Sequence, residues 1–390
     1  MKCIKRDVSN AILSLSDKFP LVFLTGPRQI GKSTVLKDIS QRGFDFINLG
    51  ETDSINYAIN DPLGILNSYK KDKVIIDDIH NAPCLISQLN AKINIDKRKN
   101  YILSGYLDSC VKKIILKEFK GRAVKLSLLP LSLQELKNSD HFPKTINEWM
   151  FKGTFPEIIS HKNHPKDFFL SYINAIFYRS IKSIRDMNKF KNFLTIVAFN
   201  SGNPVNFSRL GEELSIDART ANSWVSLLEE AYILFRLNPY PGNFGKRSFK
   251  APKFYFYDTG FLCFLLGISN PDELNLHRMR DLIFNTAIVS EAVKKYCSAG
   301  FKPKLYYWRD LDNIDNEIEL IEEKKRGLVL SKISNSHTVN MNKAKILLKI
   351  NTVSSDKKIL ERQIIYKGSD KQSFESVHFR NWESLTEQLS

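Results

Sequence analysis

One eight-residue segment constrains this chain more than any other. Residues 26–33 read Gly-Pro-Arg-Gln-Ile-Gly-Lys-Ser, which fits the phosphate-loop pattern G-x-x-x-x-G-K-[ST] at every fixed position. An apolar run at 21–24 precedes the segment and a helical pattern at 34–39 follows it. A buried strand, a glycine-rich loop and a helix are the context in which this motif folds. The sequence therefore predicts an anion site between a strand and a helix.

The chemistry of this loop indicates which anion it binds. Backbone N–H groups, the positive end of the helix dipole and the ammonium group of Lys32 converge on one small volume. A polyphosphate satisfies all of them together, and the hydroxyl of Ser33 would help to hold Mg²⁺ between its β- and γ-phosphates. The residues expected to bind the nucleotide are Gly26, Pro27, Arg28, Gln29, Ile30, Gly31, Lys32, Ser33 and Thr34.

The length and composition indicate a protein with more than one domain. A chain of 390 residues is too long for one simple core, so two or three domains are expected. The five cysteines are scattered and never stand in C-x-x-C spacing, which favours a reduced, cytoplasmic protein without a zinc site. No apolar run approaches the roughly 20 residues that span a bilayer, and the charged N-terminus lacks a signal-peptide core. No membrane partner is expected.

The net charge leaves two interpretations open. At pH 7 the formal charge is +16, and nucleic acid is the usual partner of such an excess. A solvated, lysine-rich surface would give the same number. Charge alone does not distinguish these interpretations.

Strand patterns recur through the first 130 residues. Short apolar or alternating runs at 44–49, 74–76, 101–104 and 124–128 alternate with helical stretches such as 82–94. This alternation predicts an α/β domain with a parallel sheet and helices on both faces.

Polar residues follow two of these strands. Ligands bind at the carboxyl ends of strands in such sheets, where Asp77, Asp78 and Ser104 stand. Asp77 fits the acidic residue that holds the Mg²⁺ shell through water, and Asp78 fits the carboxylate that polarises the attacking water. Ser104 would sense the γ-phosphate through a hydrogen bond. The alternative for the acidic pair is an ordinary turn or helix cap.

Several phrases, taken in order, resemble a known family. They are G-P-R-Q-x-G-K-S at 26–33, the acidic pair before Ile-His, Leu-Ser-Gly at 103–105, Gly-Arg at 121–122 before L-P-L-S-L-Q-E, and G-T-F-P-E at 153–157. The chain resembles AAA-superfamily ATPases of bacteria and archaea that pair an N-terminal P-loop ATPase domain with a C-terminal domain of unknown function. The resemblance implies ATP binding and hydrolysis with Mg²⁺, and often assembly into oligomers. It also suggests that Arg122 contacts the γ-phosphate, although a surface cation is an equal alternative. The implied catalytic residues are Lys32, Asp78, Ser104 and Arg122.

Two positions depart from the family pattern. The family usually has Asp-Glu where this chain has Asp77-Asp78, so the expected base is one methylene shorter. The bulky Tyr106 replaces a small polar residue after Gly105. Misplacing the attacking water by an ångström is costly, so slow turnover or use of ATP as a binding switch is expected as an alternative.

The middle of the chain has the order of a winged helix-turn-helix. Helical patterns at 207–214 and 218–231 precede two β-rich segments at 232–240 and 253–257. Such a module contacts duplex DNA through its second helix and a cationic wing, or docks a protein. The residues expected to contact DNA are Arg219, Asn222, Lys246, Arg247, Lys250 and Lys253.

Relatives in the family carry a C-terminal fold similar to PD-(D/E)-x-K nucleases. This chain offers Glu291, Glu319 and Lys332, but Leu330 stands where a carboxylate is expected two residues before Lys332. Leucine cannot bind a hard cation, so the resemblance implies a degenerate, inactive nuclease-like α/β domain.

These observations predict four regions and one main function. The regions are a P-loop AAA-type ATPase domain at 1–160, a helical linker at 161–200, a winged helix at 201–265 and the nuclease-like domain at 266–390. The expected function is Mg²⁺-dependent ATP hydrolysis coupled to binding of DNA or a protein. The alternatives are an ATP-gated switch that does not hydrolyse, and a DNA-binding protein with a secondary nucleotide site.

Overall fold

The computed structural model divides the chain into two compact units. It describes residues 4–106, 109–160, 164–180, 186–242, 244, 248–350, 357–369 and 372–386. The first unit consists of Met1–Leu131 with Tyr296–Lys302, and the second of Ser132–Lys295 with Pro303–Ser390. The regions expected as linker, winged helix and nuclease-like domain therefore share one unit. Within the described ranges, no helix combines the length and apolarity needed to cross a bilayer.

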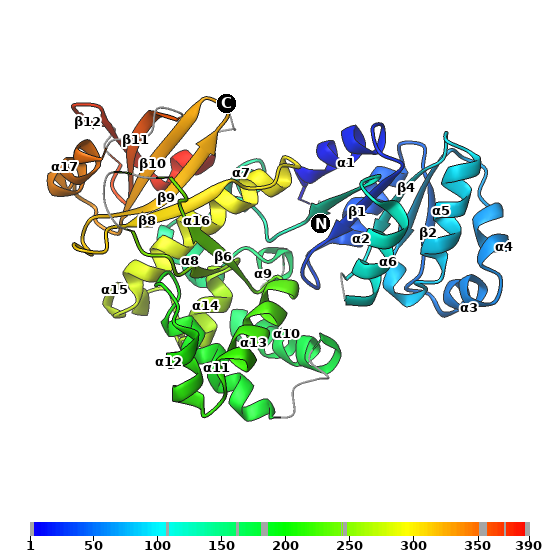
Figure 1. Ribbon diagram of the computed structural model, residues 1–390, viewed down its shortest axis with the longest axis horizontal. Coiled ribbons are helices and arrows are strands. Elements are labelled where there is room, and N and C mark those ends of the chain that lie inside the picture. Colours follow the sequence, from blue (N-terminus) through cyan, green and yellow to red (C-terminus); the bar gives the residue numbers. More distant parts are fainter. Residues whose placement is uncertain are drawn as a thin grey trace. The chain divides into compact units, whose positions relative to one another are not determined.

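The first unit is built on a five-stranded sheet (Figure 1). Its strands are β1 (Leu21–Thr25), β2 (Asp45–Asn48), β3 (Lys73–Asp77), β4 (Asn100–Ser104) and β5 (Ala123–Ser127). They lie in the order β2-β3-β4-β1-β5, and every neighbouring pair is parallel. The register pairs Leu24 with Ser104 and Asn48 with Asp77, so the carboxyl ends of these strands lie together at one end of the sheet. This confirms the predicted parallel sheet.

Helices cover both faces of this sheet. They are α1 (Val8–Ser16), α2 (Lys32–Ser40), α3 (Thr52–Asn60), α4 (Pro62–Asn67), α5 (Leu85–Ile95) and α6 (Ser109–Phe119), with a short 3-10 helix η1 at Ile79–Asn81. Leu21 and Phe23 of β1 belong to a buried cluster with residues of α3 to α6. Val22 and Leu24 are fully buried on the opposite face, and α1 and α2 contact strands of the sheet. The alternation of β1 side chains between two covered faces explains its continuous apolar run.

The second unit contains an eight-stranded mixed sheet and most of the helices. The helices are α7 (Leu133–Lys137), α8 (Ile146–Lys152), α9 (Pro156–Ser160), α10 (Pro165–Ser180), α11 (Met187–Phe199), α12 (Phe207–Leu214), α13 (Ala218–Glu230), α14 (Thr259–Leu265), α15 (Glu273–Leu276), α16 (Arg280–Ser298) and α17 (Met341–Lys349). The strands are β6 (Leu234–Pro239), β7 (Lys253–Phe256), β8 (Leu305–Arg309), β9 (Glu317–Lys324), β10 (Gly327–Ser334), β11 (Lys358–Tyr366), β12 (Ser373–Phe374) and β13 (Val377–Asn381), followed by the 3-10 helix η2 (Trp382–Thr386). Their order is β12-β13-β11-β10-β9-β8-β6-β7.

Helices α12 and α13 form at the predicted positions because polar residues cap them. The side chain of Asn206 accepts hydrogen bonds from the first backbone N–H groups of α12, and Asp217 accepts one from Thr220 in α13. Strands β6 and β7 then pair as an antiparallel hairpin. However, β6 also pairs in parallel with β8 through Asn238 and Tyr306. The hairpin is therefore part of the large sheet rather than of a separate small module, and this pairing joins the two regions expected at 201–265 and 266–390.

Candidate nucleotide-binding site

Two glycines fix the shape of the loop between β1 and α2. The φ angle of Gly26 is +154°, and a Cβ atom there would lie 2.1 Å from the carbonyl oxygen of Leu128. Gly31 has φ +90° and stands directly before α2. Residues with a side chain rarely adopt these conformations, and a Cβ at Gly26 would overlap backbone. The fixed glycines of the motif are thus required by this backbone path.

A buried arginine from the N-terminal segment forms hydrogen bonds with the backbone of the loop. The guanidinium of Arg6 donates to the carbonyl oxygen of Ile30 at 3.0 Å and to that of Leu129 at 2.5 Å. The Arg6 side chain is 7% exposed. Because Arg6 lies 24 residues before Ile30, no local pattern in the sequence pointed to this contact. Arg6 therefore ties the phosphate loop to the segment that follows β5.

The motif lysine is buried at the mouth of the loop. Its Nζ atom donates to the carbonyl oxygens of Pro27 at 2.8 Å and Gly26 at 3.2 Å. Burial lowers the pKa of Lys32 from its usual 10.5 to about 8, although Asp78 and Asp77 favour the charged form. An anion placed beside this group would stabilise its charged form and raise its pKa again. The lysine is thus poised to respond to a phosphate ligand.

The acidic pair and Ser104 meet at the neighbouring strand ends. Asp77 and Ser104 are buried, and the Ser104 hydroxyl donates to the Asp77 carboxylate. The backbone N–H of Asp78 donates to the Ser104 oxygen at 3.2 Å. Ser104 therefore links β4 to both acidic residues. Its hydroxyl proton is already used by Asp77, so the predicted hydrogen bond to a γ-phosphate would need this link to rearrange.

Asp78 has an unusual backbone conformation. Its φ and ψ angles are 58° and 43°, in the left-handed region, at the start of η1. Aspartate tolerates this region because its short side chain can bond locally, whereas longer side chains tolerate it less well. The Asp78 carboxylate lies 3.8 Å from Nδ1 of His80. The left-handed turn gives a physical reason for an aspartate here in place of the family's glutamate.

Tyr106 contacts the lysine and other groups around the loop. Its ring centre lies 4.7 Å from Nζ of Lys32 and 5.7 Å from Cζ of Arg28. The His80 ring packs edge-on against it, with centroids 4.8 Å apart. The sequence analysis marked Tyr106 only as a departure from the family, and His80 only as part of a family phrase without a role. In the fold, the tyrosine is an aromatic partner of the cations that would face a polyphosphate.

The expected magnesium ligands have the right chemistry. Ser33 stands half-buried in the first turn of α2, and Asp77 ends the neighbouring strand β3. Both offer oxygen, which Mg²⁺ prefers, and Mg²⁺ usually keeps waters and substrate phosphates as its other ligands. Within the described ranges, no three His, Cys, Asp or Glu side chains gather as a metal site of their own. The residues present fit a metal held mainly by phosphate and water.

The structure does not bring Arg122 to this site. Arg122 precedes β5, whose first residue Ala123 pairs with Leu21, the first residue of β1. The phosphate loop follows the carboxyl end of β1, whereas Arg122 precedes the amino end of β5. Arg122 therefore lies at the opposite end of the strands from the loop. Its guanidinium donates to the side chains of Asn90 at 2.7 Å and Asn94 at 2.8 Å. Arg122 cannot reach the phosphates of its own chain in this conformation.

The residues expected to contact DNA have different environments. Arg219 and Asn222 are exposed on the first half of α13, and Lys250 is exposed before β7. Lys246 and Arg247 lie outside the described residues. Lys253 is only 3% exposed and forms an ion pair with Glu317 of β9. The interpretation of Lys253 as a DNA contact is therefore wrong, because its ammonium group is committed to the interior of the sheet.

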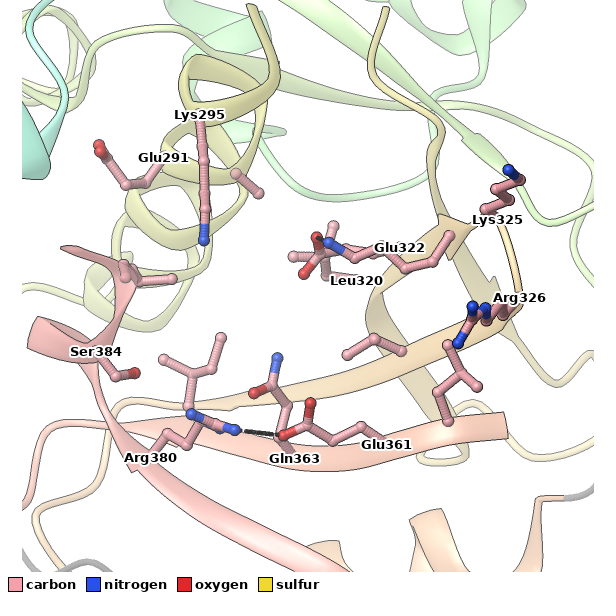
Figure 2. Close-up of a pocket in the computed structure, with 16 residues that line it drawn as sticks. Glu291, Lys295, Leu320, Glu322, Lys325, Arg326, Glu361, Gln363, Arg380 and Ser384 are labelled. Carbon is pink, nitrogen blue, oxygen red and sulfur yellow. Dashed lines mark hydrogen bonds and ion pairs between the residues drawn. The ribbon is translucent and has the colours of Figure 1, made fainter. Parts of the chain in front are cut away.

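The expected nuclease-like trio is also divided. Lys332 of β10 is buried, lies 3.7 Å from the Glu319 carboxylate and donates to the carbonyl oxygen of Glu317. Leu320 of β9 lies on the same face of the sheet as Glu291 of α16 (Figure 2). Because neighbouring residues of a strand point to opposite faces, Glu319 points to the other face. The Glu291 carboxylate instead accepts a hydrogen bond from the backbone of Leu133 at 2.6 Å. These three side chains do not form one site.

Two family models match separate parts of the chain. Residues 18–137 match a model described as "AAA domain". Residues 143–272 match a model described as "Domain of unknown function (DUF8612)". The second match spans α8 to α14 and part of the sheet.

Two relatives match most of the chain at low identity. The uncharacterized protein Rv2008c of Mycobacterium tuberculosis is 24% identical over 327 residues, which cover 82% of this chain and 71% of that protein. The uncharacterized protein MJ1544 of Methanocaldococcus jannaschii is 26% identical over 292 residues, which cover 66% of this chain and 64% of that protein. Among solved structures, the Walker-type ATPase PABY2304 of Pyrococcus abyssi aligns with a TM-score of 0.47 and 12% identity, over 67% of this chain and 96% of that one. With the phosphate loop and parallel sheet in place, the family match identifies the N-terminal domain as an AAA-type ATPase domain.

Proposed function

We propose that this protein binds ATP with Mg²⁺, hydrolyses it slowly, and uses the nucleotide state to control contact of its C-terminal unit with DNA. The observation that carries the proposal is the meeting of Lys32, Asp77 and Asp78 at the mouth of the glycine loop. The match of residues 18–137 to an AAA domain supports the nucleotide class.

Each residue has a distinct role in this proposal. The loop amides and Lys32 bind the phosphates, and Arg6 keeps the loop in shape. Ser33 and Asp77 would hold Mg²⁺, which would neutralise charge on the phosphates. Asp78 accepts a hydrogen bond from the attacking water and orients it. Ser104 keeps both acidic residues in register with β4 through its hydrogen bonds.

Three features favour slow turnover. The Ser104 hydroxyl is occupied by Asp77, the Asp78 side chain is short, and the Lys32 ammonium is held by loop carbonyls and the Tyr106 ring. An ATP-gated binding switch that barely hydrolyses is therefore the second candidate function. It differs from the first in the chemical step and not in the ligand.

The first experiment measures ATP turnover and ATP affinity for the wild type and for Lys32→Ala. We expect the variant to lose both, because no other side chain of the loop carries the ammonium group. Lys37→Ala is the matched control, since Lys37 is an exposed lysine one turn later in α2. Unchanged ATP affinity in Lys32→Ala would refute a nucleotide site at this loop. ATP binding without turnover in the wild type would favour the switch.

The DNA part of the proposal rests on the second unit. The helix-turn-helix order of α12 and α13, the β6–β7 hairpin and the exposed Arg219 and Lys250 support it. The same measurements with and without duplex DNA test the coupling. Duplex affinity that falls steeply with added salt supports phosphate contacts. DNA binding that ignores nucleotide would favour a DNA-binding protein with a secondary nucleotide site, and absence of DNA binding would favour a protein partner, including a second copy of this chain.

We also propose that the C-terminal region is not a nuclease. Glu319 of β9, to which the resemblance pointed, faces Lys332, and Glu317 in the same strand pairs with Lys253. Ammonium groups therefore balance the charge that a divalent cation would balance in an active site. Nuclease assays with Mg²⁺ or Mn²⁺ on single-stranded and duplex DNA should show no cleavage, and cleavage lost in Glu319→Gln would contradict this.

A further inference from the structure

A regular row of lysines stands at the amino ends of the strands in the first unit. Four neighbouring strands of that sheet lie in the spatial order β3-β4-β1-β5 (blue to cyan in Figure 1). An exposed lysine stands three residues before the first residue of each of these strands. In the same spatial order, the four residues, here called the lysine row, are Lys70, Lys97, Lys18 and Lys120.

The strand register brings these four positions to one end of the sheet. Lys73 and Asn100, the first residues of β3 and β4, pair with each other. Leu21 and Ala123, the first residues of β1 and β5, also pair. Leu21 pairs on its other side with Tyr101, the second residue of β4. Neighbouring strands lie about 4.8 Å apart, so three such spacings give a row roughly 14 Å long.

The carboxylates at this end of the sheet pair with other cations. The ion pairs are Lys73 with Asp17 at 2.5 Å, Arg98 with Asp96 at 3.1 Å, Lys71 with Asp45 at 3.5 Å and Lys99 with Asp72 at 3.5 Å. None of these four pairs includes a member of the lysine row. In the part of the chain that the structure describes, no ion pair or side-chain hydrogen bond engages an ammonium group of the row. The row therefore presents four positive charges to solvent.

A row of equivalent charges fits an anion whose own charges repeat. Each strand of a DNA duplex presents a phosphate about every 3.4 Å along the helix axis, so roughly four phosphates of one strand lie within 14 Å. Lysine offers a point charge on a flexible stem and lacks the planar donors with which arginine recognises a base edge. Contacts to phosphate fix the position of a protein on DNA but carry no sequence information. The row thus fits a phosphate backbone rather than a base sequence.

We propose that the lysine row binds the phosphate backbone of duplex DNA without sequence preference. This surface belongs to the first unit and lies at the opposite end of the strands from the phosphate loop. It uses neither Arg219 nor Lys250, the exposed cations proposed for the second unit. The ATPase domain would then hold DNA itself, whether or not the second unit also contacts it.

The test measures the affinity of the full chain for a labelled duplex of random sequence at several salt concentrations, by fluorescence anisotropy. Each lysine of the row should contribute about one phosphate contact. Lys18→Gln with Lys97→Gln should therefore lower the slope of log affinity against log salt by about two, and so should Lys70→Gln with Lys120→Gln. The four substitutions together should lower it by about three to four.

The matched control is Lys345→Gln with Lys349→Gln, which removes two exposed lysines of α17 in the second unit. This double variant should keep the wild-type slope. Far-ultraviolet circular dichroism of each variant checks that it is folded. The proposal is overturned if the row variants keep the wild-type slope, if row and control variants lose slope alike, or if the wild type binds no duplex at low salt. It is also overturned if the row variants lose affinity for phosphatidylserine vesicles and not for DNA.

A further variant separates this surface from the DNA contact proposed for the second unit. Arg219→Gln with Lys250→Gln removes cations of the second unit only. If this variant keeps the wild-type slope while the row variants lose theirs, the lysine row binds DNA and the contact proposed for the second unit fails. If it loses slope and the row variants do not, the second-unit contact stands and the lysine row is a solvated surface.

Discussion

The ammonium nitrogen of Lys32 lies 4.7 Å from the centre of the Tyr106 ring. This contact, with the hydrogen bonds to Pro27 and Gly26, holds the lysine against the loop. A cation over an aromatic face is stabilised by roughly 0.5–2 kcal/mol, depending on its exposure. The lysine must give up part of this stabilisation to reach a triphosphate.

Removing the ring should therefore strengthen ATP binding. We expect Tyr106→Ala to raise ATP affinity about two- to thirtyfold, the range that corresponds to the loss of one cation–π contact. Tyr106→Phe keeps the ring and should match the wild type. Fluorescent-nucleotide titration measures both. If Tyr106→Ala binds ATP less well while Tyr106→Phe does not, the ring contacts the nucleotide instead.

ATP affinity should fall as the pH rises through 8. Burial lowers the pKa of unliganded Lys32 to about 8, and a bound triphosphate raises it again. Above pH 8 the free protein has lost the proton, so binding must take one up. Affinity at pH 9 should therefore be about tenfold weaker than at pH 7, by the linkage of one proton. Calorimetry in buffers of different ionisation enthalpy measures the uptake, and a flat profile from pH 7 to 9 would contradict this role.

Asp78 should be needed for hydrolysis and not for folding. Asn tolerates the left-handed conformation as Asp does, so Asp78→Asn should fold normally, bind ATP and lose about 100-fold or more in single-turnover hydrolysis. Asp78→Glu should cost about 1 kcal/mol in stability, because a longer side chain is strained at this φ. Equal hydrolysis by wild type and Asp78→Asn would mean that Asp78 does not orient the water.

Arg122 should not contribute to ATP binding within one chain. Its guanidinium donates hydrogen bonds to Asn90 and Asn94, at the end of the strands opposite to the phosphate loop. We expect Arg122→Ala to keep wild-type ATP affinity at low protein concentration. A turnover defect that appears only as concentration rises would indicate that Arg122 acts on a neighbouring chain. Loss of ATP affinity at every protein concentration would show that the contacts of Arg122 affect the phosphate loop of the same chain.

Lys253 and Lys250 should respond in opposite ways to substitution. Lys253→Ala leaves Glu317 with Arg309, 3.5 Å away, as a remaining cation, so the loss of the buried partner should cost about 2 kcal/mol, less than an uncompensated buried charge would. Lys250→Ala removes an exposed charge and should leave the thermal midpoint unchanged. If the second unit binds DNA as proposed, Lys250→Ala lowers the salt slope of duplex binding by about one. A Lys253→Ala protein as stable as the wild type would show that the ion pair is dispensable.

Local patterns were enough to predict much of the fold. The phosphate loop, the parallel sheet with its helices, and helices α12 and α13 follow from contiguous signals such as glycine spacing, apolar runs and capping residues. The joining of β6 to β8 did not follow, because strands about seventy residues apart carry no local mark of their pairing. The segment after residue 335, in which the sequence analysis predicted no individual helix or strand, forms α17 and three strands of the same sheet.

The sequence by itself determined the phosphate loop, because its glycines and lysine are close together in the chain. Their spacing alone sets the path of the loop and the position of the ammonium group. Only the tertiary structure decided how that loop is supported and which charges are available. Arg6 donates to Ile30, and Ser104 donates to Asp77. The Tyr106 ring contacts Lys32. These contacts form because segments far apart in sequence meet at the carboxyl ends of the strands. The burial of Lys253 and the distant place of Arg122 were decided in the same way. Residue type gives the charge of a side chain, but packing gives its partner, and the partner decides whether that charge can act on a ligand.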